Sequence, residues 1–249
     1  MLNQERILYE DNHLIAVNKT NSELVQGDKT GDRTLADEVR DFIKARDHKP
    51  GNVFLGICHR LDRPTSGVVV FAKTGKALSR MNGLFREDLV SKTYWAVTAG
   101  APPGETSSGT HSGTLSGTHS GTLIHFLKKN ESQNKSYVVK EGTPGARRAE
   151  LCYEVLAESD RYVLVKVMPK TGRHHQIRVQ LSVIGCPIRG DLKYGFPRSD
   201  PGGGIHLHAR TIEFAHPVSN TPVEITAPVP EEKLWLVLEE AARSSPLEG

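Results

Sequence analysis

The sequence predicts an α+β protein built on a largely antiparallel mixed sheet with flanking helices. Two observations lead to this class. Segments with the composition of strands mostly follow one another directly along the 249-residue chain, and few helical segments separate them. A doubly wound parallel sheet would need a helical crossover between most of its strands. We expect one domain over residues 1–249, because a chain of this length buries a substantial core.

The first part of the chain combines two strands with two helices. The run GVVVFAK is apolar and β-branched, as in a buried strand. The first helix has its apolar residues on one face, and Thr34 can cap it together with Asp37 at the third helical position. The expected elements are strands at 13–19 and 67–73 and helices at 35–46 and 76–86.

The rest of the chain is predicted to be mostly strands. The alternation RAELCYEVL at 148–156 is the clearest of them. In the last helix, Pro230 suits the first position, and Glu231 and Glu232 complement the helix dipole. The expected strands are 93–98, 123–128, 148–156, 162–168, 205–214 and 223–226, and the expected helices are 173–184 and 231–242.

One segment has a different composition. The octet SGTHSGTL occupies 108–115 and is repeated without change at 116–123. A Gly, Ser and Thr tract buries too little apolar surface to offset its ordering entropy. We therefore expect a low-complexity loop insertion over 104–123.

Charge and cysteine content limit the functional classes. The chain has 32 Lys and Arg against 29 Asp and Glu, but the stretch 161–189 holds six of the basic residues and no acid, as expected of a surface that faces phosphates. Three scattered cysteines do not form a disulfide framework. The N-terminus lacks the apolar core of a signal peptide, and no stretch is apolar enough to span a membrane. These features predict a soluble, cytoplasmic protein.

The stretch HRLDRPTSG at 59–67 places Asp62 between Arg60 and Arg63, in a loop just before a predicted buried strand. The two cations favour an ionised carboxylate. Such a carboxylate can serve as a nucleophile, a general base or a salt-bridge partner, and spacing alone does not choose among these roles.

A second stretch, TGRHHQIR at 171–178, contains basic residues and a predicted turn into a helix. Gly172 can make the turn, and Arg178 would then lie one helical turn beyond His174. Placed opposite Asp62, Arg178 can form a bidentate ion pair that orients the carboxylate.

Five blocks resemble, in order, the motifs of the RluA-type pseudouridine synthase family. They are HRLDRPTSGVVVFAKT (59–74), KTYWAV (92–97), TGRHHQIR (171–178), GCPIRGDLKYG (185–195) and LHARTIEFAHP (207–217). The resemblance spans nearly the whole chain. It implies the family's catalytic fold with a central active-site cleft, and an isomerase that turns uridine in RNA into pseudouridine without a cofactor or a metal. Many relatives carry an N-terminal S4 domain, and we expect none here.

The resemblance also implies roles for individual residues. Asp62 matches the catalytic aspartate, Tyr94 the tyrosine that packs against the flipped-out base, and Arg178 the arginine that pairs with the aspartate. Arg60 matches an arginine that enters the RNA stack where the uridine has left it. Further RNA contacts are expected at Arg63, Lys92, Lys170, Arg173, His174, His175 and Arg189.

The expected partner is therefore a stem-loop of tRNA or rRNA, bound by a monomer that engages neither DNA nor membranes. The alternative is a catalytically inactive RNA-binding protein or RNA-folding chaperone of the same fold, against which the intact Asp62, Tyr94 and Arg178 argue. A glycosidase-like hydrolase would need a second carboxylate opposite Asp62. The nearest in sequence, Glu87 and Asp88, lie near the end of a predicted surface helix.

Overall fold

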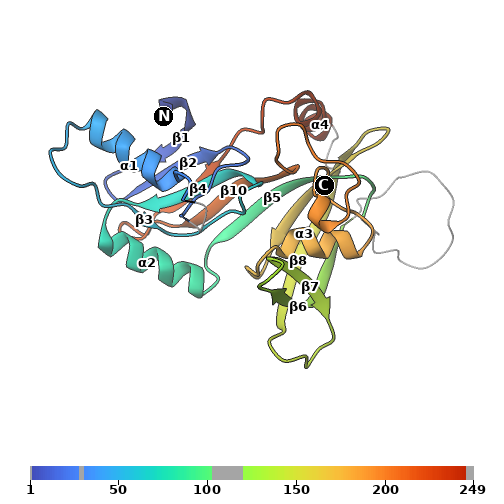
Figure 1. The fold of residues 1–249 in the computed structure, drawn as a ribbon. Coiled ribbons are helices and arrows are strands. Elements are labelled where there is room, and N and C mark those ends of the chain that lie inside the picture. Colours follow the sequence, from blue (N-terminus) through green and yellow to red (C-terminus); the bar gives the residue numbers. More distant parts are fainter. Residues whose placement is uncertain (1, 28–30, 103–119, 245–249) are drawn as a thin grey trace. The chain divides into compact units, whose positions relative to one another are not determined.

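The computed structural model describes residues 2–27, 31–102 and 120–244, which form two compact units (Figure 1). Unit 1 comprises Met1–Lys92, Gly202–Gly204 and His208–Pro230, and unit 2 comprises Thr93–Pro201, Ile205–Leu207 and Glu231–Gly249. Each unit carries strands covered by helices. Within the described part of each unit, the strand pairs are antiparallel except for one parallel pair, β4 with β10. The predicted α+β class is confirmed.

The sheet of unit 1 has one helix packed on each of its two faces. Its strands run in the order β1 (Ile7–Glu10), β2 (Leu14–Lys19), β4 (Ser66–Ala72) and β10 (Leu207–Ala215), while β3 (Gly56–Ile57) pairs with β4 and β11 (Pro222–Thr226) with β10. All seven residues of β4 are buried, as its β-branched run predicts. Helices α1 (Leu35–Arg46) and α2 (Gly75–Arg86) lie on opposite faces of this sheet (Figure 1).

The packing of unit 1 follows the predicted patterns. From α2, Ala77 and Met81 are fully buried in one core cluster with alternate residues of β2 and β4. The capping box predicted for α1 is present, because the Thr34 hydroxyl accepts from the Asp37 N–H and the Asp37 carboxylate accepts from the Thr34 N–H. A 3-10 turn, η1 (Gln4–Arg6), precedes β1.

In its described part, unit 2 is a five-stranded antiparallel sheet with two helices. The strands run in the order β5 (Ser91–Thr98), β9 (Val163–Pro169), β8 (Arg147–Glu158), β6 (Ser120–Asn130) and β7 (Lys135–Val139). Helix α3 (Gln176–Val183) contacts β6 and β7, and α4 (Lys233–Ser244) contacts β8 and β9. A second 3-10 turn is η2 (Leu192–Tyr194).

Several boundaries differ from the predictions. The helix predicted from residue 173 begins at Gln176, and the helix predicted from residue 231 begins at Lys233, so Pro230 is not its first residue. Strand β6 begins at Ser120, three residues before its predicted start. Residues 104–119 of the predicted insertion lie outside the described residues, and its last four residues, 120–123, belong to β6 and not to a loop. Among the described residues, no helix combines the length and apolar composition that crossing a membrane requires.

Candidate active site

Asp62 lies in the loop between β3 and β4 of unit 1. The Thr65 N–H donates to the Asp62 carbonyl over 3.0 Å, which closes the turn predicted from the HRLDRPTSG stretch. The Asp62 residue is half-buried, whereas Thr65 and Ser66 beyond it are buried. The turn therefore joins a partly accessible carboxylate directly to the first residue of a buried strand.

Lys19, the last residue of β2, fastens this turn from inside the unit. Its side chain is 0% exposed, and its ammonium donates to the carbonyls of Thr20, Arg63 and Thr65 at 3.0, 2.9 and 2.6 Å. Burial lowers the pKa of Lys19 to about 8, against the opposing attraction of Glu23 and Asp62. Sequence reasoning missed this residue because a lysine at a strand end is normally solvated. Its only signal was the apolar run HLIAV directly before it.

His59 and Gly67 fix the two ends of the loop. The His59 Nε2 atom accepts from the Val70 N–H at 3.0 Å, and burial lowers the pKa of His59 to about 4, so the ring is neutral and suited to accept. Gly67 has a φ of 113°, and a Cβ there would overlap the backbone of Ala209 in the neighbouring β10. The conformation of the loop thus depends on a hydrogen-bond acceptor at position 59 and on the absence of a side chain at position 67.

The two arginines beside Asp62 are exposed and contact their own unit. Arg60 donates to the Gln26 side-chain oxygen at 3.2 Å. Arg63 donates to the Ser22 carbonyl and lies 2.9 Å from an Asp32 carboxylate oxygen. Lys92, also of unit 1, is half-buried with its ammonium 5.9 Å from the centroid of the Phe85 ring, and burial lowers its pKa.

Arg178 is held on α3 of unit 2 by a bidentate ion pair. Its Nε and Nη2 atoms lie 2.7 and 2.8 Å from the two carboxylate oxygens of Asp191, and the two side chains are only 5% and 1% exposed. The guanidinium also lies 5.1 Å from the centroid of the Tyr194 ring. A planar fork paired in this way has its orientation fixed. The pairing of Arg178 with Asp62 stays a prediction.

The GDLKYG stretch at 190–195, which supplies Asp191 and Tyr194, received no role from the sequence. The Tyr194 hydroxyl accepts from the Ser136 N–H of β7 and lies 2.9 Å from Nδ1 of His175. Tyr194 therefore links the start of α3 to the β6–β7 hairpin, beside the arginine that Asp191 orients.

The histidines before α3 form a turn and not the first helical turn that we predicted. His175 takes a left-handed conformation with a φ of 54°, and the Gln176 side chain accepts from the Arg173 N–H, which stops the helix from extending backwards. His175 is buried, and burial together with Arg178 lowers its pKa to about 2. His174 is half-buried and bonded to Ser136. These positions favour a structural role for both, although RNA contacts were predicted.

The basic stretch 161–189 is divided by the fold. Lys166, Arg178 and Arg189 pair with Glu154, Asp191 and Glu232 respectively. Only three of its six basic residues, namely Arg161, Lys170 and Arg173, are exposed. The basic surface that this stretch offers is therefore limited to these three residues, because acidic side chains outside the stretch pair with the other three.

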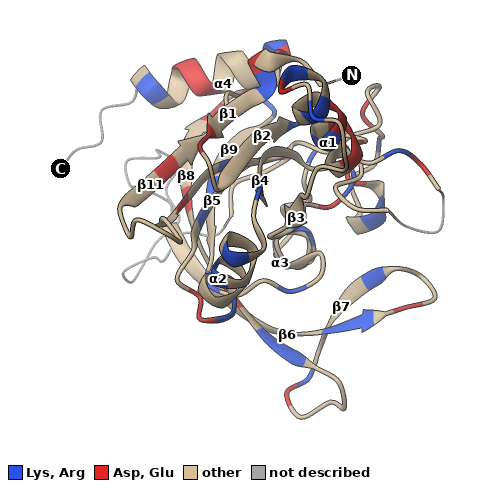
Figure 2. Cartoon of the chain, turned by 90° about the vertical axis from the view of Figure 1, so that its left-hand side faces the viewer, with Lys and Arg blue, Asp and Glu red and all other residues tan. Residues whose placement is uncertain are grey.

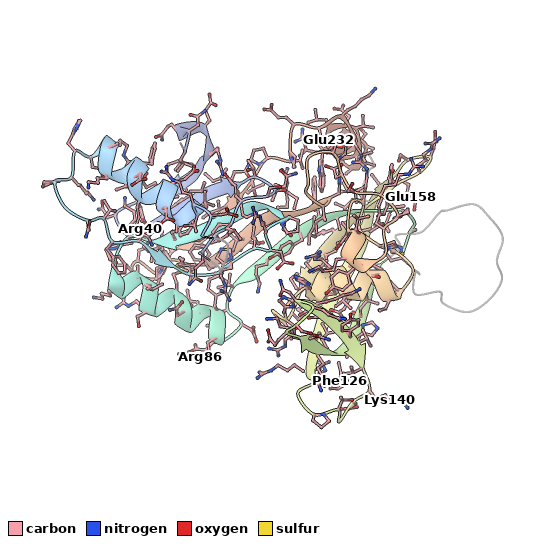
Figure 3. All side chains as sticks on the ribbon, in the orientation of Figure 1. Arg40, Arg86, Phe126, Lys140, Glu158 and Glu232 are labelled. Atoms are coloured by element: carbon pink, nitrogen blue, oxygen red, sulfur yellow. The ribbon has the colours of Figure 1, made fainter. Side chains whose placement is uncertain are left out.

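Arg189, an expected RNA contact, belongs to a cluster inside unit 2. Its guanidinium lies 2.8 Å from Glu232 and 3.6 Å from Asp200, and it also contacts His206 (Glu232 is labelled in Figure 3). Asp200, His206 and Glu232 are the single group of three possible metal ligands within the described residues. Because the guanidinium already balances both carboxylates, the cluster is better suited to structural pairing than to a cation.

Tyr94 lies on β5, opposite Val167 of β9, and is half-buried at the margin of the unit 2 core. A family model described as RNA pseudouridylate synthase matches residues 13–183, which include Tyr94, Asp62 and Arg178. The chain belongs to this family. The resemblance to RluA-type pseudouridine synthases is thereby confirmed.

Relatives and solved structures of the family match along most of the chain. The chain is 34% identical over 235 residues to the ribosomal large subunit pseudouridine synthase C of Vibrio vulnificus. The alignment covers 92% of this chain and 67% of that protein. The protein of the same name from Buchnera aphidicola subsp. Schizaphis graminum is 35% identical over 230 residues, covering 90% and 67%.

Two human structures share the fold. The structure of human RNA pseudouridylate synthase domain containing 4 superposes with a TM-score of 0.74 at 25% identity, covering 96% of this chain and 93% of that one. Human RNA pseudouridylate synthase domain containing 1 gives a TM-score of 0.64 at 25% identity, covering 96% and 95%. The protein is therefore an RNA pseudouridine synthase, an isomerase with the fold expected from the sequence.

Proposed function

We propose that the protein converts uridine to pseudouridine in RNA of the large ribosomal subunit, without a cofactor. The sequence did not decide whether the substrate is tRNA or rRNA, and the names of the bacterial relatives favour rRNA. The observation that carries the catalytic part is the Asp62 turn, in which Asp62 is half-buried and the carbonyls of Arg63 and Thr65 just beyond it accept hydrogen bonds from the buried ammonium of Lys19. Action as a cytoplasmic monomer is part of this proposal.

In the proposed reaction the carboxylate of Asp62 starts the breaking of the bond from C1′ to N1. The base turns, C1′ joins C5, and the C5 proton moves to N1, so that substrate and product have the same atoms. The uridine must first leave the RNA stack, at a cost of a few kcal/mol. Tyr94 offers a flat ring for the base and a phenol for the proton transfer.

The two arginines have different proposed tasks. Arg178, which the family resemblance pairs with the aspartate, presents a guanidinium whose orientation Asp191 fixes. Arg60 is exposed and makes one 3.2 Å hydrogen bond to Gln26, so it can move to take the place of the extruded base. Among the other predicted contacts, the exposed Arg63, Lys170 and Arg173 are best placed to touch RNA.

The experiment is pseudouridine mapping in transcribed large-subunit rRNA and, in parallel, in transcribed tRNA, each after incubation with the purified protein. We expect product with the wild type, none with Asp62→Asn, and nearly unchanged RNA affinity in that variant. Asp41→Asn is the matched control, since Asp41 is an exposed acid on α1. RNA binding without product by the wild type would make the protein an RNA-binding protein of the same fold. Product in tRNA alone would overturn the proposed substrate.

A further inference from the structure

We infer that the outer face of the β6–β7 hairpin and the adjoining end of β8 binds RNA outside the target uridine. This inference rests on the proposed function and adds a surface that the sequence motifs do not include. Residues 120–148 hold six Lys and Arg residues and two Glu residues, a net charge of +4, whereas the whole chain carries +3. Figure 2 shows these cations on both strands of the hairpin. The hairpin segment is thus one of two strongly basic parts of the chain, the other being 161–189 with six basic residues and no acid.

Strand register divides the hairpin into two faces. Lys128 of β6 lies opposite Tyr137 of β7, and Phe126 lies opposite both Val139 of β7 and Arg148 of β8. Directly opposed residues point to the same side of a sheet. Lys128, Tyr137 and Arg148 therefore share a face with Phe126, and these three residues are exposed. Figure 3 shows Phe126 and Lys140 at the same end of the hairpin.

The opposite face of the hairpin is packed within unit 2 at Leu127 and Ser136, while Lys129 and Val138 of that face are exposed. Leu127 is packed with Ala149, Val179 of α3 and Tyr194 in one core cluster, and Ser136 is 2% exposed. The hairpin is consequently fastened to α3 on its inner side, which leaves its outer side as a preformed surface.

The outer face has the chemistry of a single-stranded nucleic-acid platform. Tyr137 is 39% exposed, and the ammonium of Lys135 lies 5.3 Å from the centroid of its ring. Lys128 has no acidic partner among the described residues, and Arg148 pairs with Glu150 at 2.5 Å. Exposed aromatic rings between cations bind RNA by stacking with bases and by pairing with phosphates. A polyanion is the occupant that this charge favours.

Lys135, which lies on β7, has a second explanation. β7 is the outer strand of the unit 2 sheet, and lysines on such strands prevent sheets of different molecules from pairing. The two explanations differ in what the cations contact, so the experiment measures RNA affinity and self-association together.

The test uses the full chain carrying Asp62→Asn, so that binding is measured without turnover, and transcribed large-subunit rRNA as the probe. We expect Lys128→Gln with Arg148→Gln to weaken binding and to reduce the slope of log affinity against log salt by about 0.7–0.9 for each phosphate that is no longer neutralised. Tyr137→Ala should weaken binding by about fivefold to a hundredfold, because a base can no longer stack on the ring. The matched control is Lys44→Gln with Lys76→Gln, which removes two exposed cations of unit 1.

A second measurement does not depend on the variants folding. Acetylation of lysines in the wild-type protein should be slowed at Lys128 and Lys135 when rRNA is added, and unchanged at Lys44 and Lys76. Equal protection of all four lysines, or unchanged affinity with new self-association in the hairpin variant, would overturn the inference. If the wild type instead binds rRNA through the hairpin but forms no pseudouridine, the proposed function fails while the binding surface stands.

Discussion

Replacing Lys19 by methionine tests how strongly the Asp62 turn depends on one buried ammonium. The change keeps an unbranched side chain that is shorter by the ammonium group, and it removes three hydrogen bonds, to Thr20, Arg63 and Thr65. Hydrogen bonds from a charged group contribute about 1.5–3 kcal/mol each, so their loss costs about 4–9 kcal/mol. The variant also removes a burial penalty, which for a pKa lowered from 10.5 to about 8 is about 3 kcal/mol. The net expectation is a loss of about 1–6 kcal/mol in the free energy of unfolding.

Urea unfolding and single-turnover kinetics measure the two consequences. Because two of the carbonyls freed by the change, those of Arg63 and Thr65, follow Asp62 in its turn, we expect the rate constant for pseudouridine formation to fall at least tenfold while RNA affinity changes little. Lys44→Met is the control, since Lys44 is exposed on α1 and its replacement should change stability by less than about 0.5 kcal/mol. A Lys19→Met protein as stable and as active as the wild type would refute the claim that this lysine holds the turn.

The remaining predictions concern pH, the ion pair and the loop. As pH rises through about 8, neutral Lys19 keeps two N–H donors for three carbonyls, so activity should fall in the wild type and not in Lys19→Met. The pKa of Lys19 is about 8 in the folded protein and 10.5 in the unfolded chain, so between pH 8 and 10.5 the unfolded chain binds more protons. The contribution of Lys19 to the free energy of unfolding should therefore rise with pH over this range. The measurement is the difference in unfolding free energy between the wild type and Lys19→Met. Asp191→Asn should cost about 3 kcal/mol and lower kcat, and the apolar pair Arg178→Met with Asp191→Leu should unfold at a higher temperature than Asp191→Asn. His59→Ala should cost about 1–3 kcal/mol in urea unfolding, because it leaves the Val70 N–H without its acceptor. Gly67→Ala should give little folded protein by circular dichroism, because its Cβ overlaps the Ala209 backbone.

Local patterns predicted most of the elements. The helix at Leu35–Arg46 has the predicted bounds and cap, because its apolar face and its capping residues agree. The strands β1, β3 and β7 were missed. β3 has only two residues, and β7 has the polar composition KSYVV because its outer face is exposed to solvent. Short or half-exposed strands depend on partners distant in sequence, and local composition does not identify those partners.

The site was predicted where chemistry is local and missed where it depends on the fold. The motif marked Asp62 and its turn directly. Lys19 was missed because its partners Arg63 and Thr65 lie 44 and 46 residues away in sequence. Asp191 was missed because its partner Arg178 lies 13 residues away, on α3. The reverse error concerned Arg189, whose charge appeared available until Glu232, far along the chain, was placed beside it.

The parallel pairing of β4 with β10 sets an order of events during synthesis. Gly67 of β4 pairs with Ala209 of β10, so the sheet that follows the Asp62 loop gains this neighbouring strand only after most of the polypeptide has left the ribosome. Contacts of such long sequence separation slow folding and leave early segments exposed in the meantime. The apolar run of β4 is therefore the part of a nascent chain that a chaperone would be expected to shield, and C-terminal truncations that remove residues 208–230 should leave it open to aggregation.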